Sequence, residues 1–100
     1  MAVVYRYAFN PNVPKENVEV AIVLTIFALE SLHGAAHARL DAGHYFNTDK
    51  HKLVIDADTP VGLDFNKLFL GFFQREHGPD AFRVERLTNP NTANREEQVS

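Results

Sequence analysis

The chain contains no cysteine and no tryptophan, and only two of its 100 residues are serine, Ser31 and Ser100. Without cysteine it can form no disulfide, no thiolate nucleophile and no cysteine-ligated zinc site. The absence of cysteine suits the reducing cytoplasm, where we expect the protein to reside. A serine-based triad is not indicated, because Ser31 falls in an expected helix and Ser100 in a polar tail.

Other common functional signatures are also missing. The five glycines are scattered along the chain, so none of them forms a phosphate-binding glycine-rich loop. The net charge of −3 argues against nucleic acid as a partner, since nucleic-acid binders carry a clustered basic surface. The start of the chain lacks signal-peptide features, and the longest apolar run is about half as long as a bilayer span requires. We expect a soluble protein with no membrane partner.

The residues that are present indicate one globular domain. Apolar residues make up 45% of the chain, and eight of the eleven aromatics are phenylalanine. A chain of this length can bury a real core, and this composition predicts that the core is rich in aromatic rings. We assign residues 1–87 to a single α+β domain. Residues 88–100 are polar and show no apolar periodicity, which predicts a disordered tail.

Four strands and two helices are expected from the patterning. Alternating apolar residues at the start of the chain are typical of a half-buried strand, with Tyr5 and Tyr7 pointing inward. Apolar residues between 61 and 73 recur at spacings of three and four, which is typical of a helix. The expected strands cover residues 2–9, part of 36–47, 52–57 and 81–87, and the expected helices cover about 14–33 and 60–77.

The ends of both helices carry sequence signals. Pro14 and Pro60 suit a first helical turn, and Gly34 and Gly78 suit a helix stop. For the strand within 36–47, a helix continuing past Gly34 to about residue 42 is the alternative. Gly71 lies inside the second helix, and we interpret it as allowing the first helix to approach closely.

The element order is β-α-β-β-α-β. With right-handed crossovers it predicts a ferredoxin-like two-layer sandwich: an antiparallel four-stranded sheet in the order 4-1-3-2, with two helices on one face. Such a fold hosts many unrelated functions, so it carries no functional conclusion by itself.

The main functional feature is the run 20–29, which is apolar on almost every side and is interrupted only by Thr25. A surface helix normally has one apolar stripe and one polar face. Not every apolar side chain of this helix can face the sheet, so a partner should cover some of them. We predict a small protein-interaction module, either a homodimer or a binder of another protein, with no catalytic activity evident. The predicted interface residues are Val20, Val23, Leu24 and Phe27.

An alternative hypothesis places a ligand on the open face of the sheet. Polar residues expected there could hold an anionic ligand or a polar partner, so the protein could be a small ligand-binding domain or an enzyme. Arg83 and Glu85 are expected beside them, and opposite charges on neighbouring strands would compensate each other. The candidate ligand-binding residues are Arg6, Arg39, Asp41, Tyr45 and Asp56.

The segment 54–59, with Asp56, Asp58 and Thr59, resembles the D-x-D-x-T pattern of haloacid-dehalogenase-type phosphotransferases. In those enzymes the first aspartate attacks phosphorus and the second acts as an acid or base. They also carry a larger parallel sheet, and the pattern lies near the start of their chains. We therefore interpret Asp58 or Thr59 as the cap of the second helix and Asp56 as a solvent-facing residue, with the Asp56/Asp58 pair kept as the catalytic alternative.

Two histidines, His33 and His37, stand four residues apart and would share a face on an unbroken helix. Gly34 lies between them, and no third ligand follows at a diagnostic spacing. We predict no metal site and no cofactor.

Overall fold

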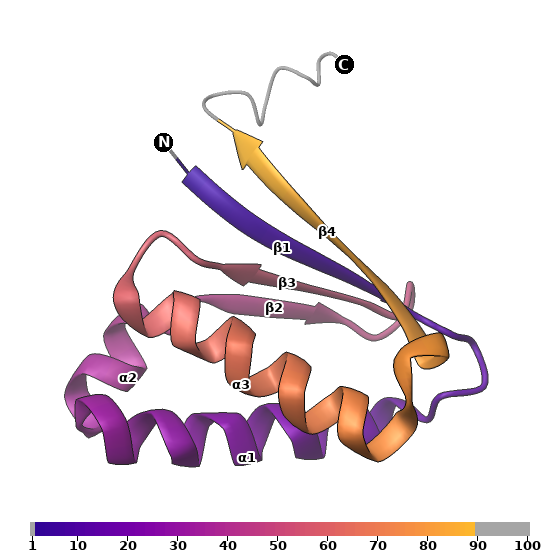
Figure 1. Ribbon diagram of the computed structural model, residues 1–100, viewed down its shortest axis with the longest axis horizontal. Helices are drawn as coiled ribbons and strands as arrows, with labels where there is room; N and C mark the ends of the chain where they lie inside the picture. The colour runs from indigo at the N-terminus through magenta and orange to yellow at the C-terminus, as the bar shows by residue number, and fades with distance from the viewer. Residues whose placement is uncertain (1, 90–100) are drawn as a thin grey trace.

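The computed structural model describes residues 2–89. Within this range an antiparallel four-stranded sheet is combined with three α-helices (Figure 1). The elements in chain order are β1 (Ala2–Phe9), α1 (Lys15–His33), α2 (Ala35–Asp41), β2 (His44–Asn47), β3 (Lys52–Asp56), α3 (Pro60–His77), a 3-10 turn (Pro79–Ala81) and β4 (Phe82–Asn89). The α+β class is as predicted.

The strand order in the sheet is β2-β3-β1-β4, which is the predicted order read from the opposite edge. Each neighbouring pair is antiparallel, and β1 lies between β3 and β4. Helices α1 and α3 pack side by side, and the start of β1 and the end of β4 project beyond them (Figure 1). Near the start of β4, Val84 remains 40% exposed although it lies in register with the buried Tyr7.

Local sequence explains where the two long helices end. Gly34 and Gly78 have φ angles of 87° and 85°, a region that side chains disfavour, so both act as helix stops as predicted. Their N–H groups return to carbonyls of the last turn, at Glu30 and Gln74. At the other end of α3, Thr59 accepts a hydrogen bond from the Gly62 N–H at 2.9 Å, which confirms the predicted cap.

The secondary structure of residues 35–41 differs from the strand expected from the sequence. These residues form the helix α2, so the strand expected within residues 36–47 is limited to the four residues of β2, His44–Asn47. The segment contains three alanines and a leucine, which favour helix over strand, and the buried Ala38 anchors it to the core. The alternative of a continued helix is closer to the structure, although Gly34 separates α1 from α2.

The core is built from aromatic rings of β1 and α3. Tyr7 meets Phe69 edge-on with ring centroids 5.2 Å apart, and Phe9 meets Phe73 at 5.0 Å. The Tyr7 hydroxyl donates to Oδ1 of the buried Asn66. Burial, together with the nearby Tyr5, raises the pKa of Tyr7 above its ordinary value. The core thus contains one satisfied polar pair among apolar residues.

Two glycines of α3 have opposite surroundings. A Cβ on Gly62 would overlap the carbonyl oxygen of Asp56 and lie 3.1 Å from the Cα of Ala57, so only glycine lets α3 start this close to the end of β3. A Cβ on Gly71 would meet no atom within 4 Å. The expectation that Gly71 allows close packing of the first helix is therefore wrong.

The last strand extends to Asn89, two residues further than expected. The remaining residues of the predicted disordered tail lie outside the described residues.

Candidate functional site

The side of α1 that faces away from the core carries large apolar side chains. The exposed fractions are 58% for Val20, 48% for Val23, 51% for Leu24 and 61% for Phe27. These four residues, which we call the outer stripe, recur at spacings of three and four and therefore lie on one face of the helix. They are the four residues that the sequence analysis predicted as an interface.

The opposite side of α1 is buried. Its core-facing residues are Val18, Ala21, Ile22, Thr25 and Leu29. The hydroxyl of Thr25 donates to the Ala21 carbonyl at 2.7 Å, so the one polar residue of the apolar run is satisfied within its own helix. The helix therefore has two apolar faces, and only one of them is covered.

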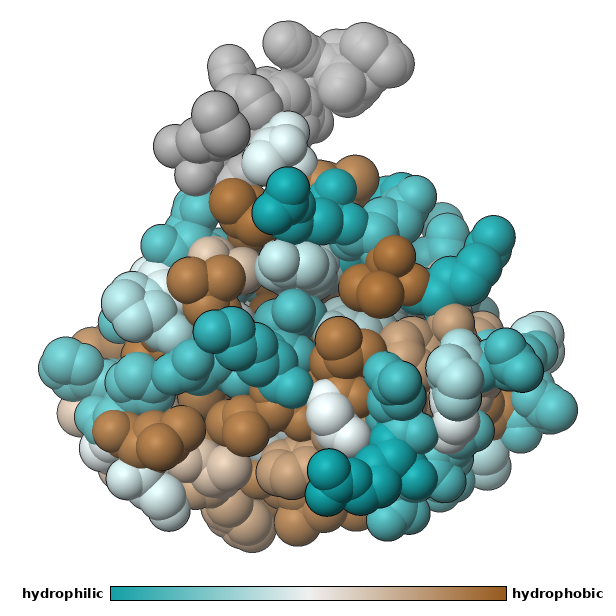
Figure 2. Space-filling view, viewed as in Figure 1, coloured by the Kyte–Doolittle hydropathy of each residue, from teal (hydrophilic) through white to brown (hydrophobic). Residues whose placement is uncertain are grey.

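A groove runs between α1 and α3 beside the outer stripe. In the view of Figure 2, hydrophobic side chains gather over the lower part of the molecule, where these two helices run. The groove has a volume of about 260 Å³. Its lining residues are Asn17, Val20, Ala21, Leu24, Phe72, Phe73, Glu76 and His77. The ring of His77 lies 4.3 Å from that of Phe73 and forms part of a mixed apolar and polar wall.

Charged side chains border both ends of the outer stripe. Glu16 and Glu19 lie in the first turns of α1, where the helix dipole favours acidic groups, and Lys15 precedes them. At the other end, the exposed Arg39 lies on α2, two residues before Asp41. Both ends of the stripe therefore carry acidic and basic side chains.

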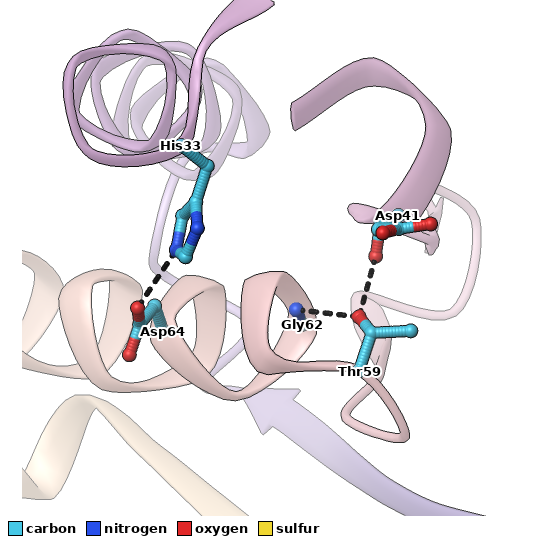
Figure 3. Close-up of polar contacts among 5 residues, drawn as sticks. All are labelled: His33, Asp41, Thr59, Gly62 and Asp64. Atoms are coloured by element: carbon cyan, nitrogen blue, oxygen red, sulfur yellow. Dashed lines mark hydrogen bonds and ion pairs between the residues drawn. The ribbon is translucent and has the colours of Figure 1, made fainter. Parts of the chain in front are cut away.

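His33 fixes the C-terminal end of α1 to α3. Its Nε2 donates to Oδ2 of Asp64 at 2.8 Å (Figure 3). The pair orients the two helices that form the groove. His33 is therefore engaged with a carboxylate, and no cluster of three metal-ligating side chains occurs within residues 2–89.

The segment that resembles a phosphotransferase pattern is occupied by backbone contacts. Asp58 accepts a hydrogen bond from the Val3 N–H at 2.8 Å, and Asp56 accepts one from the Asp58 N–H at 2.9 Å. Thr59 donates to the Asp41 carbonyl at 3.1 Å while it accepts from Gly62 (Figure 3). Asp58 thus joins this segment to β1, Thr59 joins it to α2 and the start of α3, and Asp56 stabilises the turn between β3 and α3.

The open face of the sheet contains only part of the predicted ligand-binding set. Arg6 lies in register with Glu85 on one side and with Val54 on the other, and Val54 pairs in turn with Tyr45. Arg6 donates through Nε to Glu85 Oε1 at 3.0 Å and forms an ion pair with it through Nη2. Neighbouring rows carry Arg83 and Asp56.

Arg39 and Asp41 are not on this face. Both belong to α2, so their predicted position on the open face of the sheet is wrong. The prediction assigned them by strand alternation, and a helix places residues 39 and 41 by a different period.

Sequence reasoning missed the far wall of the groove. Phe72 is half-buried and lines the groove with Glu76 and His77. The spacing of 72 and 76 shows that they share a helix face, but only the packing of α1 beside α3 shows what that face contacts.

Comparisons of the chain with protein-family models, with curated proteins and with solved structures found no match. Within residues 2–89 every helix is too short or too polar to cross a membrane.

Proposed function

We propose that this protein is a small interaction module that forms a homodimer through the outer stripe of α1. The observation that carries the proposal is the exposure of four large apolar side chains opposite the buried face of the same helix. Apolar surface removed from water contributes about 25 cal/mol per Å², and contiguous exposed patches of this kind mark interaction sites. Association would therefore be driven mainly by burial of this stripe.

A second copy of the chain is the proposed partner. In a two-fold arrangement the same surface is used twice. If two α1 helices cross antiparallel, Glu16 and Glu19 of one copy approach the end of the other copy that carries Arg39. A parallel arrangement would bring the glutamates of the two copies together, which like-charge repulsion disfavours.

The spacing of the stripe suggests where the two-fold axis passes. With the axis between Val23 and Leu24, Val23 of one copy faces Leu24 of the other copy across the interface. Phe27 then lies opposite Val20, which lines the groove of the other copy. An aromatic anchor in a partner's pocket is the usual form of an interface hot spot.

The 19 residues of α1 span about 28 Å, and a stable interface buries roughly 800 Å² on each partner. One helix face is too small alone. The proposed contact therefore includes the groove wall at Phe72 and the exposed Leu32 and Leu40, which extend the apolar surface beyond the C-terminal end of the stripe.

We also propose that the fold is ferredoxin-like, with α2 as an additional helix before β2. The strand order and the antiparallel pairing of every neighbour support this assignment. The proposed location is the cytoplasm, which the absence of cysteine suits.

Native mass spectrometry and sedimentation velocity of the tag-free protein test the proposed function. We expect a species of twice the 11.3 kDa chain mass at micromolar concentration, dissociating on dilution. A monomer at every accessible concentration would contradict the homodimer.

A further inference from the structure

A hollow lies on the open face of the sheet, above Ala8. Its volume is about 320 Å³, which is at the lower end of the range for small-molecule pockets (roughly 300–1,000 Å³). The side chain of Ala8 is the smallest in its row of the sheet, because its cross-strand neighbours are Lys52 on β3 and Arg83 on β4. A short side chain between two long ones leaves a depression with cationic walls.

The charges around this hollow do not cancel. Arg6 and Glu85 also line it, but their charges balance each other in an ion pair. Lys52 and Arg83 form no ion pair within residues 2–89. Asp80 lines an adjacent hollow together with Arg83 but is not within ion-pair distance of it. Two uncompensated positive charges thus flank Ala8 in a chain whose net charge is −3.

The spacing of the two cations suits a small oxyanion. Lys52 and Arg83 lie on the two strands that flank β1, so their backbones are two strand spacings, or about 10 Å, apart. Both side chains are long enough to meet over Ala8. A guanidinium binds two oxygens of an oxyanion at once, and an ammonium adds a compact charge.

We propose that this hollow binds the phosphate group of a small anionic ligand, held between Lys52 and Arg83 above Ala8. Arg6, fixed by Glu85, borders the site. The hollow is larger than one phosphate group, so the rest of a phosphate monoester fits beside it. The site is separate from the proposed dimer contact, because the helices pack on the other face of the sheet, where Tyr7 and Phe9 point.

The test is a titration of ¹⁵N-labelled protein with inorganic phosphate and with glycerol phosphate at constant ionic strength, followed by NMR and calorimetry. We expect saturable shifts at residues 8, 52 and 83, with the monoester at least as tight as inorganic phosphate. Lys52→Gln and Arg83→Gln should each weaken binding about tenfold, as loss of a charged hydrogen bond implies. Ala8→Leu keeps every charge, fills the hollow and should weaken binding equally.

Arg86→Gln is the matched control. It removes the same charge from the same strand, but Arg86 pairs with Tyr5 and so lies on the other face of β4. We expect this substitution to change the affinity for phosphate less than twofold. The absence of saturable shifts would overturn the proposal. Equal losses in Arg83→Gln and Arg86→Gln would also overturn it, because they would show a general charge effect. Neither result bears on the oligomeric state.

Discussion

Leu24 and Thr25 are adjacent on α1, yet the leucine is half exposed and the threonine is fully buried. Burial of the threonine is possible because its hydroxyl donates to the Ala21 carbonyl. A helix adapted only to its own core would place these two residues the other way round. The inversion supports the proposed contact of the outer stripe with a second copy.

A disulfide trap tests the position of the two-fold axis. Because the natural chain has no cysteine, Val23→Cys introduces a single thiol. With the axis beside residue 23, the two thiols of a dimer lie close to each other, within the reach that a disulfide requires (Cα atoms less than about 7 Å apart). We expect rapid covalent dimer formation under mild oxidation, measured on a non-reducing gel.

Ser31→Cys is the control for this trap. Residue 31 is also exposed on α1, but in the antiparallel arrangement the two copies of it are roughly 22 Å apart along the helix axes. We expect this variant to stay uncross-linked. Faster cross-linking of Ser31→Cys than of Val23→Cys would refute the proposed axis.

Replacing either of the two glycines of α3 by alanine should change stability, with opposite signs at the two positions. Gly71→Ala should stabilise the protein by about 1 kcal/mol, because alanine favours a helix and the added methyl group has free space. Gly62→Ala should destabilise it by about 3 kcal/mol or more, because the added Cβ overlaps the backbone of Asp56. The free energy of unfolding in urea measures both, and the same sign for the two variants would contradict the described packing.

The buried hydroxyl of Tyr7 should make the protein less stable in alkali. Burial raises its pKa, so the folded state keeps the hydroxyl proton above pH 10, where an unfolded tyrosine loses it. The unfolded state then binds fewer protons, and stability falls by up to about 1.4 kcal/mol per pH unit. The contribution is complete below about pH 10 and decreases as the pH rises further.

Tyr7→Phe is the matched variant for this effect. It keeps the ring in the aromatic core but leaves the buried Asn66 without its donor, so it should lower stability by about 1–3 kcal/mol at neutral pH. Its unfolding free energy should decline less steeply than that of the natural protein between pH 9 and 11. Identical slopes would show that Tyr7 does not cause the alkaline loss.

Most of the fold could be predicted because its signals are local. Alternation identified β1, and the two glycines at positions 34 and 78 identified where α1 and α3 end. The segment 35–41 could not be assigned in this way, because its alanines favour a helix while Gly34, just before them, is a helix stop. The burial of Ala38, a tertiary contact, accompanies the helical form.

The candidate sites also differ in how far the sequence predicts them. The outer stripe could be predicted from the run 20–29 alone, since no helix of that composition can bury all of its apolar side chains in a two-layer domain. The hollow above Ala8 could not, because Lys52, Ala8 and Arg83 come together only through the register of three strands. The groove depends on how α1 and α3 pack, which the sequence does not specify directly.

The measurement that tests the central claim most directly is sedimentation velocity of Phe27→Glu beside Leu63→Glu. Both residues are exposed and apolar, but Leu63 lies on α3 and does not line the groove. Both variants should keep the natural circular dichroism spectrum. We predict that Phe27→Glu is a monomer and that Leu63→Glu remains a dimer. A dimer that persists in Phe27→Glu, or that is lost equally in both variants, would contradict the proposed role of the outer stripe.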